Sequence, residues 1–176
     1  MDESKINQTN KNFAQYLDDE LLVKSKFEEV VFNTYIKNSL ESLKVAINLY
    51  ENNISYLWTI VSSYYAMFYI ASAFIYVRGY KSQHQIVHKI INDSLIVLAK
   101  DKLEKHYFKE YEEEKNKALS ASESLLDSYE YERIKRSRFQ YETTEDIKRS
   151  KALTSLNRAK KFVLVLRKLI NKIKKS

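Results

Sequence analysis

Four cationic side chains fall within six residues of the segment 133–141, whose sequence is RIKRSRFQY. Arginine guanidinium groups grip phosphate oxygens in a forked geometry, and an aromatic ring can stack on a nucleobase. Arg133, Arg136, Arg138 and Tyr141 are therefore the candidate nucleotide- or RNA-binding residues. The alternative interpretation is that these cations end a helix and complement its dipole there.

The histidines offer little metal chemistry. His84 and His88 are four residues apart, so on a helix both could face one ion. No glutamate follows the first of them in the metalloprotease manner, and no third ligand is evident, so we predict no metal site. One glycine in the whole chain cannot build a glycine-rich phosphate loop, and we predict no cofactor.

Charge is distributed unevenly along the 176 residues. Residues 147–176 contain eleven Lys or Arg and no Asp or Glu. Because the net charge of the chain is +7, the first 146 residues sum to −4. Such a basic end can attract phosphates, an acidic partner or anionic lipid, or it can simply line the solvated face of a helix.

The elements that must position these residues are long helices, because the chain has no proline and a single glycine. The most distinctive is the uncharged stretch 54–77, which is long enough to cross a membrane. Its hydroxyls and tyrosines are spread along its length, and its apolar positions repeat with helical spacing: Leu57, Val61, Tyr64, Phe68, Ala71 and Ile75. We therefore predict the buried central helix of a bundle, with a single membrane span as the alternative.

Apolar periodicity predicts further helices on both sides of this rod. Gly79 is expected to end the central helix in a left-handed conformation, and Ser82 with Gln85 has the spacing of a capping box for the next helix. The acidic patch 110–114 is expected to be solvated, and no strand is predicted. The expected helices are 12–23, 27–52, 54–77, one from about 82 to 99, 106–138, and a last helix capped by Thr143 or Thr144. This is an all-α, up-and-down bundle of about five principal helices, forming one domain over 1–176 with residues 1–26 as an N-terminal extension.

The order of several motifs resembles the small archaeal and bacterial HEPN-domain proteins. These motifs are the YYAMF sequence at 64–68, the break at Arg78-Gly79, His84 shortly afterwards, the segment from Arg136 to Tyr141, and a closing AKKF sequence at 159–162. The resemblance covers roughly residues 35–170. It implies an all-α bundle, often a homodimer, and frequently a neighbouring small nucleotidyltransferase of the MNT type in a toxin–antitoxin-like pair.

Many HEPN domains are metal-independent ribonucleases that use an arginine followed, four to six residues later, by a histidine. No histidine follows Arg133 or Arg136 here. The pair Arg78 and His84 has the spacing of this ribonuclease motif, but it lies earlier in the chain than the resemblance places the motif. The catalytic candidates are therefore Arg136, Tyr141, Arg78 and His84.

The resemblance favours a cytoplasmic, dimeric protein that binds nucleotide or RNA, or that is the companion subunit of a nucleotidyltransferase. The alternatives are a metal-independent ribonuclease toxin and a non-catalytic oligomerisation partner. The N-terminus lacks the apolar core of a signal peptide, which favours the cytoplasm and no membrane association.

Overall fold

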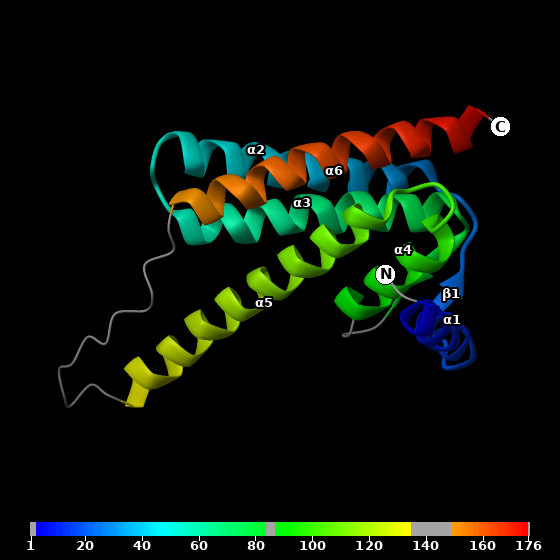
Figure 1. The fold of residues 1–176 in the computed structure, drawn as a ribbon, viewed down its shortest axis with the longest axis horizontal. Helices are drawn as coiled ribbons and strands as arrows, with labels where there is room; N and C mark the ends of the chain where they lie inside the picture. Colours follow the sequence, from blue (N-terminus) through cyan, green and yellow to red (C-terminus); the bar gives the residue numbers. More distant parts are fainter. Residues whose placement is uncertain (1–2, 84–86, 135–148, 176) are drawn as a thin grey trace.

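The structure is a computed structural model that describes residues 3–83, 87–134 and 149–175. It confirms the all-α bundle (Figure 1). Four long helices build the body, and two shorter helices and two short strands complete the described part. The elements are α1 (Glu3–Asp18), β1 (Leu22–Lys24), α2 (Glu29–Glu51), α3 (Tyr56–Val77), β2 (Tyr80–Ser82), α4 (Val87–Ala99), α5 (Lys105–Ile134) and α6 (Arg149–Lys175).

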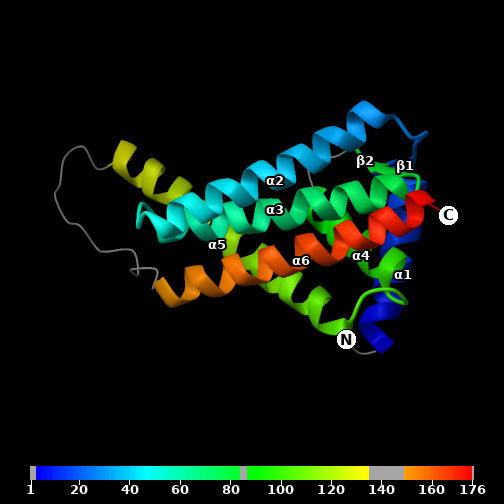
Figure 2. The same cartoon turned by 90° about the horizontal axis from the view of Figure 1, so that it is seen from above.

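Helix α3 is the core rod of the bundle. Helices α2 and α6 flank it on one side, while α4 and α5 lie on the other side, with α5 crossing obliquely (Figures 1 and 2). Five of the six residues of its predicted stripe are buried, and Leu57 is half-buried. By length and composition α3 is also the one described helix that could cross a membrane, but 78% of its most apolar window is buried inside the protein. This extent of burial is what a central helix shows.

Helices α2 and α3 form the antiparallel pair that their short connection predicts. Asn53, just after α2, has a left-handed conformation with φ 51°, which asparagine tolerates at a helix end. The side chain of Ser55 caps α3 by accepting a hydrogen bond from the backbone N–H of Trp58 at 3.2 Å. Midway along the pair, the buried Ser39 hydroxyl donates to the carbonyl of Ala66 at 2.7 Å. This bond fixes the register between the two helices.

The prediction of no strand is wrong. Strands β1 and β2 form an antiparallel ladder in which Val23 pairs with Lys81. Gly79, at φ 87°, ends α3 as predicted and turns the chain into β2. Ser82 belongs to this ladder, and α4 as described begins at Val87. The prediction that Ser82 caps the start of α4 is therefore wrong. Two three-residue strands are too short to show a period-2 pattern, so the sequence could not reveal them.

The N-terminal helix begins earlier and ends earlier than the predicted 12–23, because the chain turns after Asp18 to enter β1. It packs against α4 through a buried carboxylate. Oδ2 of Asp93 accepts hydrogen bonds from the hydroxyl of Tyr16 at 2.8 Å and from the side-chain amide of Asn12 at 2.9 Å. Burial, together with the bond to Asp93, raises the pKa of Tyr16, so its hydroxyl remains a donor.

The acidic patch on α5 is not solvated as predicted. Glu114 is fully buried, and Nη1 of Arg158 on α6 lies 2.8 Å from Glu114 and 2.8 Å from Glu113. Partial burial by itself lowers the pKa of Arg158, but its hydrogen bonds to the two carboxylates outweigh this effect and raise it. The patch therefore holds α6 against α5. Periodicity could not show this, because the partner of the acids lies 44 residues away.

Candidate functional site

The candidate nucleotide-binding residues fall mostly outside the described part of the chain. Arg133 belongs to the last turn of α5, and nothing is described of its side chain. Arg136, Arg138 and Tyr141 lie outside the described residues. Whether the four side chains gather at one phosphate site, and whether Arg136 and Tyr141 are catalytic, therefore stays a prediction.

Of the second catalytic candidate, the pair Arg78 and His84, the structure describes only Arg78. Arg78 is the exposed C-cap residue of α3, with backbone bonds to the last turn of that helix. His84 lies outside the described residues, so the ribonuclease alternative through Arg78 and His84 is also untested. Among the residues that the structure describes, no group of three or more His, Cys, Asp or Glu side chains could hold a metal ion.

Helix α6 carries the largest set of solvated cations in the described structure. One side of it is a mostly apolar seam that is buried from Ala152 to Ile170. The opposite side presents five exposed cations within one outward arc, and none makes an ion pair within the described residues. We call them the α6 basic face: Lys160, Lys161, Arg167, Lys168 and Lys175. At about 1.5 Å per residue, the face extends over about 22 Å.

Contacts to α2 hold both ends of α6 in place. Near its start, the guanidinium of Arg149 lies 5.5 Å from the centre of the Tyr50 ring. Near its end, Nζ of Lys174 lies 4.5 Å from the centre of the Phe32 ring and 3.8 Å from a carboxylate oxygen of Glu29. No acidic residue occurs anywhere in α6. The helix is therefore a supported rod that keeps one positive side turned to solvent.

A histidine that the sequence did not single out for catalysis is held among aromatic rings between α3 and α4. Nδ1 of His88 lies 2.7 Å from the hydroxyl of Tyr64, and its ring centre lies 4.8 Å from that of Phe68. Burial, with a smaller contribution from Lys115, lowers the pKa of His88, while burial raises that of Tyr64. A neutral imidazole and a protonated hydroxyl therefore share this hydrogen bond, and the tautomer of His88 decides which of the two donates.

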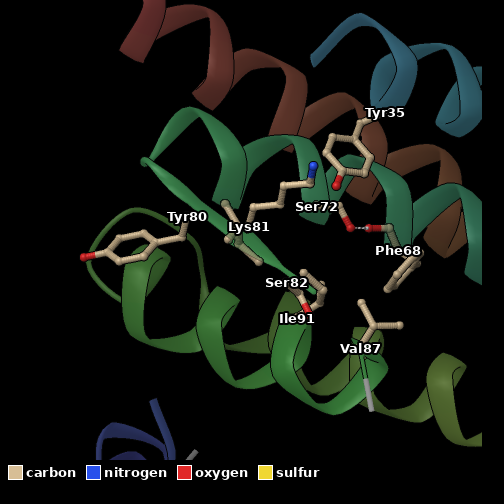
Figure 3. Close-up of a pocket in the computed structure, with 9 residues that line it drawn as sticks. Tyr35, Phe68, Ser72, Tyr80, Lys81, Ser82, Val87 and Ile91 are labelled. Carbon is tan, nitrogen blue, oxygen red and sulfur yellow. Dashed lines mark hydrogen bonds between the residues drawn. The ribbon is translucent and has the colours of Figure 1, made fainter. Parts of the chain in front are cut away.

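Phe68, which contacts this histidine, also lines a pocket of about 250 Å³ (Figure 3). Helices α2, α3 and α4 and strand β2 contribute its walls. Sequence analysis missed it, because β2 was not predicted. Its described lining residues are Tyr35, Phe68, Ser72, Ile75, Tyr80, Lys81, Ser82, Val87 and Ile91.

The comparison with curated proteins finds no match to this chain. The comparison with protein-family models matches the HEPN domain over residues 32–169, which extends from the start of α2 to the last turns of α6. The matched region contains the core rod, the pocket and the whole α6 basic face except Lys175. Since the match covers more than three quarters of the chain, this protein belongs to the HEPN-domain family.

Proposed function

We propose that the protein is a nucleotide- or RNA-binding HEPN protein whose α6 basic face contacts the phosphate backbone of RNA. The observation that carries the proposal is the acid-free α6, with five exposed cations in one arc and no ion pair to satisfy them among the described residues. Membership of a family that is broadly nucleotide- or RNA-related supports it.

The physical reason is counterion release. Phosphates neutralised by Lys and Arg release condensed cations, and the entropy gained drives binding without any sequence preference. The cations of segment 133–141 come before α6 in the sequence, and we propose that Arg136 and Arg138 contact phosphates of the same RNA. Tyr141 would then be available to stack on a base.

The test is binding of a fluorescent single-stranded RNA in EDTA, followed by anisotropy. The variant Lys160→Gln/Lys161→Gln/Lys168→Gln is expected to weaken binding at least about tenfold. A matched control, Lys44→Gln/Lys100→Gln/Lys102→Gln, removes the same charge from exposed positions outside α6 and is expected to change affinity less than about twofold. Equal losses in the two variants would show that only net charge matters and would reject the proposed site.

The same reaction distinguishes the alternative activities. Cleavage of the RNA in EDTA that is lost on His84→Ala would favour the metal-independent ribonuclease, whereas binding without cleavage would favour the binding protein. A protein that forms oligomers but has no salt-sensitive RNA affinity would be the non-catalytic oligomerisation partner. A gel reports cleavage, anisotropy titrations at several salt concentrations report binding, and light scattering reports the oligomeric state.

We also propose that the chain forms a homodimer and, in a toxin–antitoxin-like pair, is the companion of an MNT-type nucleotidyltransferase. An uncharged strip of α3 supports self-association: Trp58 is 50% exposed, and Tyr65 and Tyr69 on the same side are half-buried. Protein interfaces are enriched in Trp and Tyr and depleted of charged residues. Because each copy carries a net charge of +7, an uncharged strip is where two copies can meet with the least repulsion. Light scattering tests this: Trp58→Lys should yield monomer, and an unchanged mass would reject this interface.

A further inference from the structure

The pocket between α2, α3, β2 and α4 has one apolar wall and one polar wall. Phe68 and Ile75 of α3 and Val87 and Ile91 of α4 supply the apolar surface. Strand β2 closes the pocket, and its residue Tyr80 is turned away, with its ring 5.4 Å from that of Phe13 (Figure 3). The polar side chains that remain on the β2 wall belong to Lys81 and Ser82.

Three polar groups on the pocket walls have no hydrogen-bond or ion-pair partner among the described residues. They are the ammonium of Lys81, the hydroxyl of Tyr35 and Oγ of Ser82, which is buried. In Figure 3 the Lys81 side chain extends across the pocket toward Tyr35. By contrast, the hydroxyl of Ser72 already donates to the carbonyl of Phe68 at 2.9 Å. A buried hydroxyl without a partner is costly, so Ser82 favours an occupant that can bond with it.

All three groups can donate a hydrogen bond at neutral pH. Lysine is a donor only, and a serine hydroxyl can donate. Burial, with smaller contributions from Tyr76 and Tyr69, raises the pKa of Tyr35, so its phenol keeps its proton. No Asp or Glu is among the described lining residues. The pocket therefore presents positive charge and donors to whatever occupies it, next to an apolar wall.

We infer that this pocket binds a small amphipathic anion, which is a carboxylate or phosphate monoester carrying an aromatic or aliphatic body. The anionic group contacts Lys81 and Tyr35, which Figure 3 shows close to each other, and the body packs against Phe68, Val87 and Ile91. Ligand sites commonly combine a mostly apolar lining with a few convergent polar groups. At about 250 Å³ the space fits a compound smaller than a typical drug molecule.

Backbone pairing holds Lys81 in place for this role. Lys81 pairs with Val23 on β1, and β1 follows helix α1 in the sequence. A ligand bound here contacts α2, α3, β2 and α4 at once, so it stabilises the native state by mass action. None of the described lining residues belongs to α6. The site is therefore separate from the α6 basic face and goes beyond the proposed RNA binding.

Isothermal titration calorimetry with phenyl phosphate and benzoate tests the inference and distinguishes the two anionic groups. For ligands of roughly ten non-hydrogen atoms, a dissociation constant of about 1 mM or lower is expected for at least one of them. Inorganic phosphate lacks the apolar body and benzyl alcohol lacks the charge, so each should bind at least about tenfold more weakly. Benzyl alcohol binding as tightly as the anions would overturn the proposed role of Lys81.

The variant Lys81→Met retains the length of the side chain and is expected to weaken binding of the anionic probe at least about tenfold. Lys100→Met, at an exposed position after α4, is the matched control and should bind like the wild type. Tyr35→Phe provides a second, milder variant with an expected loss of about threefold or more. The absence of binding by both anions, or unchanged binding in Lys81→Met, would overturn the inference.

Discussion

Replacing Arg158 by Met should destabilise the protein strongly, because it leaves a carboxylate buried without its arginine. Glu114 is fully buried, and Nη1 of Arg158 lies 2.8 Å from its Oε1. Removing one partner of a buried pair costs about 3–5 kcal/mol. Because Arg158 is 24% exposed and Lys117 also reaches Glu114 at 2.8 Å, we expect the lower end, about 3 kcal/mol. For a chain of this size that lowers the Tm by about 6–12 °C.

Urea unfolding followed by circular dichroism measures this loss. Lys161→Met on the same helix removes an exposed cation and should change the free energy of unfolding by less than about 0.5 kcal/mol. Adding Glu114→Gln to Arg158→Met neutralises the buried acid and should recover about half of the loss, since the pair is coupled. If Arg158→Met were no more costly than Lys161→Met, the ion cluster would not be what holds α6 against α5.

Three further predictions concern charge, protonation and backbone conformation. If all five cations of the α6 basic face contact phosphates, the logarithm of RNA affinity should fall with the logarithm of salt concentration with a slope of about −3.5, and the triple glutamine variant on α6 should reduce the slope to about −1.4. His88 should titrate by NMR below the ordinary value of about 6.5, and Lys115→Met should raise its pKa. Because the folded state resists protonation of His88, stability should fall as pH drops below about 6.5, and His88→Gln should reduce that loss. Gly79→Ala should cost about 1–2 kcal/mol in urea unfolding through its φ of 87° alone, since no atom beyond its two chain neighbours lies within 4 Å of the added methyl group.

The core and seams were predictable because they depend on local periodicity. The stripe of α3 and the seam of α6 repeat at three- and four-residue intervals, and burial follows that repeat. Gly79 and Asn53 were predictable for a related reason, since few residue types tolerate a positive φ. These features belong to single helices and their ends.

The features that escaped prediction join segments that are distant in the sequence. Lys81 entered a pocket wall because β2 pairs with β1, and neither strand is long enough to be recognised. Glu114 became buried because Arg158 meets it from another helix. An acidic patch and a basic helix both look solvated in sequence, and only tertiary packing shows which charges pair and which remain exposed.

The most direct test of the account is photo-crosslinking of a thiouridine-containing single-stranded RNA to the wild-type protein in EDTA, with the crosslinked peptides mapped by mass spectrometry. RNA on the α6 basic face predicts crosslinks to peptides that contain Lys160, Lys161 and Lys168, and their loss in the triple glutamine variant. RNA that binds but crosslinks only to peptides of α1 and α4 would contradict the assignment of this face.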